Sequence, residues 1–94
     1  MIVSFGNKET EKIFNGDVSL DYRGDIQKTA LRKLLIVEAA TSINDLRSPP
    51  GNRLEKLSGD RSSQYSIRIN DQWRICFTWT DENNAIEVDI VDYH

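Results

Sequence analysis

The last third of the chain alternates between apolar and polar residues in three successive runs. Their apolar positions are Tyr65, Ile67 and Ile69, then Trp73, Ile75, Phe77 and Trp79, then Ile86, Val88 and Ile90. A period of two is typical of strands that bury one face. The polar clusters at 70–72 and 81–84 predict hairpin turns, so neighbouring runs should pair antiparallel.

The turn lengths predict the register of these strands. A three-residue loop places Arg68 opposite Arg74, where two like charges repel by a few tenths of a kcal/mol. Either Asp89, diagonal to Arg74, neutralises this face, or the face binds phosphate; the register leaves both interpretations open. A four-residue loop gives the remaining expected pairs, which are Trp79 with Ile86, Phe77 with Val88, Ile75 with Ile90 and Arg74 with Val91.

The first half of the chain has a different pattern. Residues 1–5 are short and β-prone, and Asn7 can cap a helix over 8–14. Asp25 can cap a second helix over 26–40, and residues 53–57 predict a short strand after the Pro49-Pro50 loop. The second helix carries an apolar stripe formed by Ile26, Ala30, Leu31, Leu34, Leu35 and Val37. The expected order is therefore one strand, two helices and four strands.

Composition restricts the class of protein. The 94 residues are 38% hydrophobic and 29% charged, which predicts a single globular domain over 1–94. The single cysteine, Cys76, cannot form an internal disulfide and fits a reducing cytoplasm. No run approaches the roughly 20 apolar residues of a membrane span, and the N-terminus lacks the pattern of a signal peptide.

Charge is unevenly distributed around a net value of −3. Residues 53–79 carry an excess of bases, whereas residues 80–94 carry five acidic residues and no basic one. A net negative charge weighs against nucleic acid as a partner, but the local excess of bases points the other way.

Few reaction types suit these residues. There is no G-x-S-x-G, P-loop or G-x-G-x-x-G motif, and no spacing of metal ligands. Cys76 lies in the middle of a strand, where packing explains it. The only histidine, His94, could act as a general acid or base near neutral pH. Because RNA supplies its own 2′-OH nucleophile, RNA cleavage needs only a base, an acid and positive charge.

Several short segments resemble one known family. They are Asn52-Arg53-Leu54, Ser66-Ile67-Arg68-Ile69-Asn70, Gln72-Trp73-Arg74 and Asp92-Tyr93-His94. In this order and at this length, the chain resembles the HigB-type toxins of bacterial type II toxin–antitoxin systems, within the RelE/ParE superfamily. The resemblance extends over nearly the whole chain.

The resemblance implies an α+β fold with two N-terminal helices packed on one face of a mixed, mainly antiparallel five-stranded sheet. It implies a ribosome-dependent endoribonuclease that cuts mRNA without metal or cofactor and leaves a 2′,3′-cyclic phosphate. It also implies a HigA-like helix-turn-helix antitoxin, through which alone the toxin would reach operator DNA.

The resemblance also implies site residues. By position, Asp92, Tyr93 and His94 match the C-terminal catalytic cluster, and Arg74 matches the arginine that stabilises the phosphate. Glu55 departs from the pattern, since some members carry a catalytic histidine there, although a carboxylate can serve as general base. Four further bases are the predicted RNA contacts: Arg53, Lys56, Arg61 and Arg68.

Two other functions stay open. The same fold occurs in relatives that bind DNA gyrase, and an attenuated toxin would mainly bind its antitoxin. Glu55 and the net negative charge favour the second of these. For the terminal cluster to work together, the last strand should end or twist near Val91, because strict alternation turns Asp92 and His94 toward the core.

Overall fold

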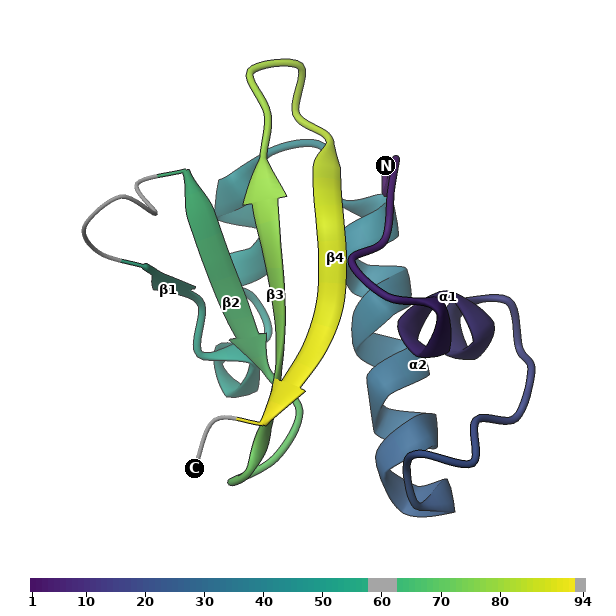
Figure 1. Ribbon diagram of the computed structural model, residues 1–94. Coiled ribbons are helices and arrows are strands. Elements are labelled where there is room, and N and C mark those ends of the chain that lie inside the picture. The colour runs from purple at the N-terminus through teal and green to yellow at the C-terminus, as the bar shows by residue number, and fades with distance from the viewer. Residues whose placement is uncertain (58–62, 93–94) are drawn as a thin grey trace.

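Two helices precede four strands in the computed structural model, which describes residues 1–57 and 63–92 (Figure 1). The elements are α1 (Lys8–Phe14), α2 (Gly24–Ala39), the 3-10 turns η1 (Ile43–Arg47) and η2 (Pro50–Asn52), β1 (Glu55–Lys56), β2 (Gln64–Arg68), β3 (Trp73–Trp79) and β4 (Ala85–Asp92). Neither described helix is both long and apolar enough to span a bilayer.

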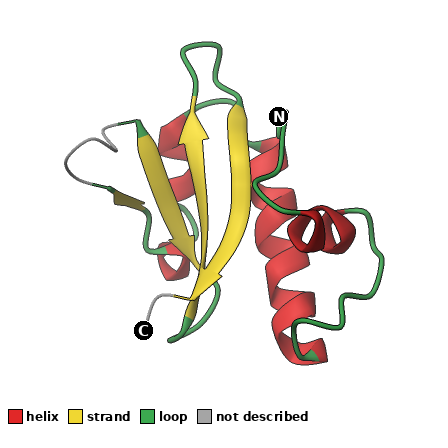
Figure 2. Cartoon of the chain, in the orientation of Figure 1, coloured by secondary structure: helices red, strands yellow, loops and turns green. Residues whose placement is uncertain are grey.

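The strands form one antiparallel sheet in the order β1-β2-β3-β4. In the part of the chain that the structure describes, both helices lie behind or beside the sheet, and its front face carries no helix (Figure 2). We call this front face the open face. Because side chains alternate along strands, every second residue of β2, β3 and β4 projects from it.

The N-terminal segment is not the fifth strand that the sequence predicts. It runs beside β4 and meets it at two isolated parallel bridges, Ile2 with Ala85 and Phe5 with Val88. Between these bridges Glu87 has a φ of 55°, and its backbone amide donates a hydrogen bond to Ser4 Oγ of the N-terminal segment at 2.9 Å. The ladder is interrupted there, so the sheet formed by residues 1–57 and 63–92 has four antiparallel strands, and the prediction of a mixed five-stranded sheet is not confirmed.

The predicted register is confirmed at the start of β3, which is the end of the strand that lies away from the β3–β4 turn. Arg68 faces Arg74 across β2 and β3. Ile75 faces Ile90, and Arg74 faces Val91, across β3 and β4. Arg74 is thus the central residue of a row that crosses three strands on the open face.

Near the β3–β4 turn the predicted register was wrong by one residue. Trp79 faces Ala85 instead of Ile86, and the predicted partner of Phe77 falls in a β-bulge. Glu87 is the extra residue, in the left-handed region that side chains other than glycine rarely adopt. Ala85 therefore takes the buried place that alternation assigns to Ile86.

The first helix follows its sequence signal, but α2 begins at Gly24 with Arg23 at the N-cap position, so the prediction that Asp25 caps it was wrong. Asn7 Oδ1 accepts a hydrogen bond from the Thr10 amide at 2.8 Å, and α1 has the predicted bounds. The stripe on α2 differs from the prediction at one position, since Leu35 is 50% exposed. Lys33 is buried instead, among the apolar residues of the same helix.

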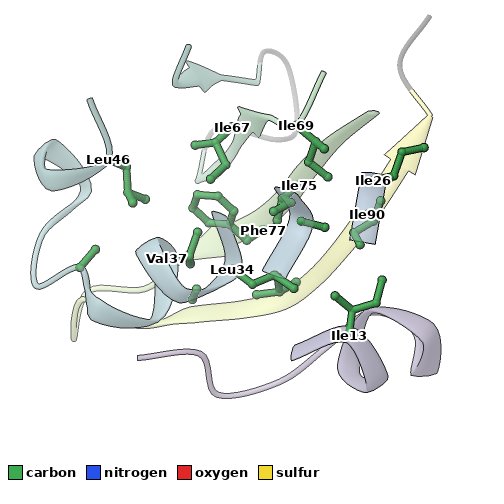
Figure 3. Packing of buried hydrophobic residues seen from close by; sticks show 14 residues of the cluster. Ile13, Ile26, Leu34, Val37, Leu46, Ile67, Ile69, Ile75, Phe77 and Ile90 are labelled. Atoms are coloured by element: carbon green, nitrogen blue, oxygen red, sulfur yellow. The ribbon is translucent and has the colours of Figure 1, made fainter. Parts of the chain in front are cut away.

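The core lies between α2 and the back of the sheet (Figure 3). Leu34 and Val37 of α2 pack in one cluster with Ile67, Ile75 and Phe77 of the sheet. All five side chains are at most 2% exposed. Burial of this kind contributes roughly 1.5–3 kcal/mol per side chain, which supports the sheet that presents the open face.

Substitution of Glu87 tests the bulge. Glu87→Gly should be tolerated, because glycine adopts positive φ without steric cost. Glu87→Val should lower the free energy of unfolding by about 1–2 kcal/mol relative to Glu87→Gly, because a β-branched residue clashes in the left-handed region. Urea unfolding measures both, and equal stability of the two variants would contradict this backbone geometry.

Candidate functional site

The guanidinium of Arg74 joins three segments on the open face. Its Nε donates to Ser66 Oγ at 2.8 Å, and its Nη2 donates to the Arg53 carbonyl at 2.6 Å and the Ser66 carbonyl at 3.3 Å. Nη2 also lies 3.2 Å from Glu55 Oε1. Arg74 is only 7% exposed, so this cation is buried with hydrogen bonds and a carboxylate to compensate it.

Glu55 is the exposed partner in this ion pair. It lies on β1 opposite Ser66, and its side chain is 55% exposed. One side of the carboxylate faces the buried guanidinium while solvent reaches the rest. This arrangement fixes a carboxylate at the surface, where it can accept a proton from a bound molecule.

Arg53 precedes β1 in a left-handed conformation, with φ 45° and ψ 56°. Its amide donates to the Pro50 carbonyl at 3.1 Å, and its own carbonyl accepts from Arg74. This conformation ends the turn η2 and delays the start of the strand. The predicted strand over 53–57 is therefore reduced to Glu55–Lys56.

These residues surround a hollow of about 400 Å³, within the ~300–1,000 Å³ range of ligand pockets. We call it the arginine hollow; its lining residues are Arg53, Glu55, Arg68, Asn70, Asp71 and Arg74. Arg68 forms an ion pair with Asp71, so Glu55 and Asp71 are the carboxylates that offset the facing arginines. Three guanidinium groups around one hollow suit a phosphate group.

A second hollow, of about 420 Å³, lies on the β3–β4 side of the same face. We call it the acidic hollow, because Glu87, Asp89 and Asp92 line it and none of the described residues around it is basic. Within residues 1–57 and 63–92, no three His, Cys, Asp or Glu side chains are placed to hold a metal ion. The open face is thus divided into a basic and an acidic half.

Asp89 is the half-buried carboxyl of the acidic hollow. Among the described residues its side chain forms no hydrogen bond and no ion pair, and Arg74 pairs with Glu55, so the interpretation that Asp89 neutralises Arg74 is not supported. Burial, with a smaller contribution from Glu87, raises the pKa of Asp89. A Cβ on Gly6 would lie 3.1 Å from the Asp89 side chain, so glycine leaves room for this carboxyl group.

The remaining predicted residues are placed less centrally. β4 extends to Asp92, whose Oδ2 accepts from Gln72 Nε2 at 3.1 Å at the edge of the sheet. Lys56 pairs with Tyr65, and strand alternation turns it to the opposite face from Glu55. Arg61, Tyr93 and His94 lie outside the described residues, and with them the predicted twist of the terminal cluster.

Sequence reasoning missed two groups that shape the site. Ser66 Oγ accepts from Arg74, and a buried Lys33 on α2 donates to Asn52, next to Arg53. The sequence contains a signal for Lys33, because this lysine occupies a position on the apolar stripe of α2, three residues after Ala30. Ser66 lies in a segment that resembles the family, but the alternation gives it no special role, since a serine on the polar side of a strand is ordinary.

Asp89→Asn tests the electrostatics of the acidic hollow. A raised folded-state pKa means that ionisation of Asp89 costs stability as pH rises from the ordinary value of 3.8 through the folded-state pKa. Above that pKa the cost is complete. The variant should therefore unfold at higher urea concentration than the parent at pH 7, and this gain should shrink toward pH 3. Asp81→Asn, in the exposed β3–β4 turn, is the control; a less stable Asp89→Asn at pH 7 would contradict the prediction.

Comparison with known proteins supports a family assignment. Residues 3–94 match the model of the HigB-like toxins, described as RelE-like toxin of type II toxin-antitoxin system HigB. The chain is 39% identical over 84 residues to Toxin HigB-1 of Vibrio cholerae serotype O1, covering 86% of each protein. It is 29% identical over 94 residues to Endoribonuclease HigB of Proteus vulgaris, with complete coverage of both.

Solved structures show the same fold at lower sequence identity. The YoeB dimer from Staphylococcus aureus has a TM-score of 0.64 and 21% identity, covering 100% of this chain and 97% of that chain. The YoeB–YefM complex from Staphylococcus aureus has a TM-score of 0.59 and 17% identity, covering 100% and 98%. With the family match over residues 3–94, these findings show that the chain belongs to the HigB-like family of RelE-like toxins of type II toxin–antitoxin systems.

Proposed function

We propose that this toxin inhibits translation as a ribosome-dependent, metal-independent endoribonuclease that cuts mRNA. The observation that carries the proposal is the arginine hollow, where Arg53 and Arg68 flank the ion pair between Arg74 and Glu55. The name of the Proteus vulgaris relative, Endoribonuclease HigB, supports the same reaction. The hollow offers the positive charge and the proton acceptor that RNA cleavage needs.

In the proposed mechanism the scissile phosphate lies in the arginine hollow. Glu55 removes the proton of the 2′-OH, whose oxygen attacks the phosphorus and displaces the 5′-oxygen of the next nucleotide. Arg53 and Arg68 bind the non-bridging oxygens, while Arg74 holds Glu55 in place and adds positive charge for the phosphorane. His94 protonates the leaving 5′-oxygen, which leaves a 2′,3′-cyclic phosphate and a 5′-hydroxyl.

The other predicted residues assist at the margin of this site. Asp92 orients the C-terminal cluster, and Tyr93 stacks on a base or shares in proton transfer. Lys56 and Arg61 contact the RNA backbone outside the hollow, where they add salt-dependent affinity. Under this proposal the acidic hollow repels phosphate and directs the RNA strand toward the arginines.

The proposed partners follow from the family. They are the ribosome with its mRNA and a HigA-like helix-turn-helix antitoxin, with operator DNA reached only through the antitoxin. The YoeB–YefM complex, in which a toxin of the same fold is bound by its partner, supports an antitoxin complex. A cytoplasmic location fits a target on the ribosome.

Arg68→Ala tests the phosphate contact. It should lower the rate of ribosome-dependent mRNA cleavage about 10²-fold, because one preorganised charged donor is lost. The matched control is Arg23→Ala, since Arg23 is likewise paired with a nearby aspartate, Asp25, but lies at the start of α2. Primer extension on mRNA incubated with ribosomes measures both variants, and equal effects of the two would sink the assignment.

Glu55→Gln tests the general base. Glutamine keeps a hydrogen-bond acceptor for Arg74 but cannot take the 2′-OH proton, so cleavage should fall about 10²–10⁴-fold with little change in thermal stability. Deletion of His94 should also slow cleavage by removing the acid. If both variants cut mRNA like the parent, the mechanism is wrong. Double-strand DNA breaks without mRNA cuts would instead favour a gyrase-directed toxin.

A further inference from the structure

Lys33 is a buried cation on the core side of α2. The residue is 4% exposed, and its Nζ donates a hydrogen bond to Asn52 Oδ1. In the described part of the chain no carboxylate lies within ion-pair distance of Lys33. Burial lowers the pKa of Lys33, and Arg32 and Arg68 add repulsion. A lysine in such a place costs stability, and its bond to Asn52 is what offsets that cost.

Both polar atoms of the Asn52 side chain form hydrogen bonds that hold the turn before β1. While Oδ1 accepts from Lys33, Nδ2 donates to the carbonyls of Leu46 and Ser48 at 3.2 Å each. The Asn52 amide donates to the Pro49 carbonyl at 2.9 Å. Asn52 is fully buried, so it is the point at which α2 is tied to the loop that carries Arg53.

Arg53 follows directly and depends on this tie. A non-glycine residue at φ 45° is strained and persists only where its surroundings determine it. Its carbonyl accepts from Arg74, and its side chain lines the arginine hollow. Two hydrogen bonds and the peptide link between Asn52 and Arg53 thus connect Lys33 to Arg74.

We propose that Lys33 is a positioning residue for the RNA-cleaving site. Its ammonium holds Asn52, and Asn52 keeps Arg53 in the left-handed conformation that presents the guanidinium to RNA and the carbonyl to Arg74. The inference rests on the proposed function, since it assigns Lys33 a role in the same reaction. Lys33 acts through Arg53 and does not touch the RNA.

The test is Lys33→Met, which keeps the length of the side chain but removes the ammonium. Its matched control is Lys28→Met, an exposed lysine on the same helix. Lys33→Met should lower kcat/KM for ribosome-dependent mRNA cleavage about tenfold or more, since small misplacements in a site can cost up to about 10²-fold. Lys28→Met should change it less than about twofold.

A double-mutant cycle separates positioning from a general loss of stability. In an Arg53→Ala background, Lys33→Met should lower cleavage by a clearly smaller factor than in the parent, because the part of the effect that passes through the Arg53 guanidinium is already removed. An equal loss in both backgrounds would show a merely structural role and overturn the proposal. Unchanged cleavage by Lys33→Met in the active parent background would overturn it as well.

Backbone NMR supplies a measurement that does not depend on activity. The chemical shifts and the amide–Hα coupling of Arg53 should show the left-handed conformation in the parent and Lys28→Met, and its loss in Lys33→Met. If the parent protein cuts no mRNA, the proposed function fails. Independently of cleavage, a left-handed Arg53 in Lys33→Met would overturn the positioning role of Lys33. If Lys33→Met does not fold, Lys33→Gln, which loses the charge but keeps a shorter donor, is judged by the same outcomes.

Discussion

The buried guanidinium of Arg74 is the interaction on which the open face depends. A cation at 7% exposure has to be compensated, and here the compensation comes from Ser66 on β2, the Arg53 carbonyl and Glu55 on β1. The two-residue strand β1 forms few backbone hydrogen bonds with β2. The hydrogen bonds and the ion pair of the Arg74 guanidinium therefore contribute much of what holds β1 against β2. These contacts hold Arg53 and Glu55 at one hollow, and the register of β2 and β3 adds Arg68 to it.

Charge on the open face follows from the same arrangement. The arginine hollow concentrates the bases of β2, β3 and the preceding loop, whereas β4 brings Glu87, Asp89 and Asp92 to the other half. A net charge of −3 therefore does not describe the surface that RNA would meet. Locally, a basic patch beside an acidic one both attracts and orients a polyanion.

Some of this arrangement could be predicted and some could not. Turn length and alternation together determine register, which is why the opposition of Arg68 and Arg74 was predicted correctly. The bulge at Glu87 could not be predicted, because a left-handed residue other than glycine leaves no trace in the alternation. The tie between Lys33 and Asn52 was visible only as a charge on an apolar stripe. The contact between Glu55 and Arg74 could not be predicted either. It depends on the residue at which β1 begins, and the left-handed backbone of Arg53 in the preceding turn sets that residue.

Under the proposed function, the hydrogen-bond geometry of Arg74 matters more to cleavage than its positive charge. Arg74→Lys keeps the positive charge but cannot bond to Ser66, Arg53 and Glu55 at once, because an ammonium lacks the planar fork. Single-turnover cleavage of mRNA on ribosomes by this variant is the most direct measurement, with thermal unfolding to show that it is folded. A folded Arg74→Lys protein should cut about 10²-fold more slowly than the parent. Cleavage at the parent rate would contradict the claim.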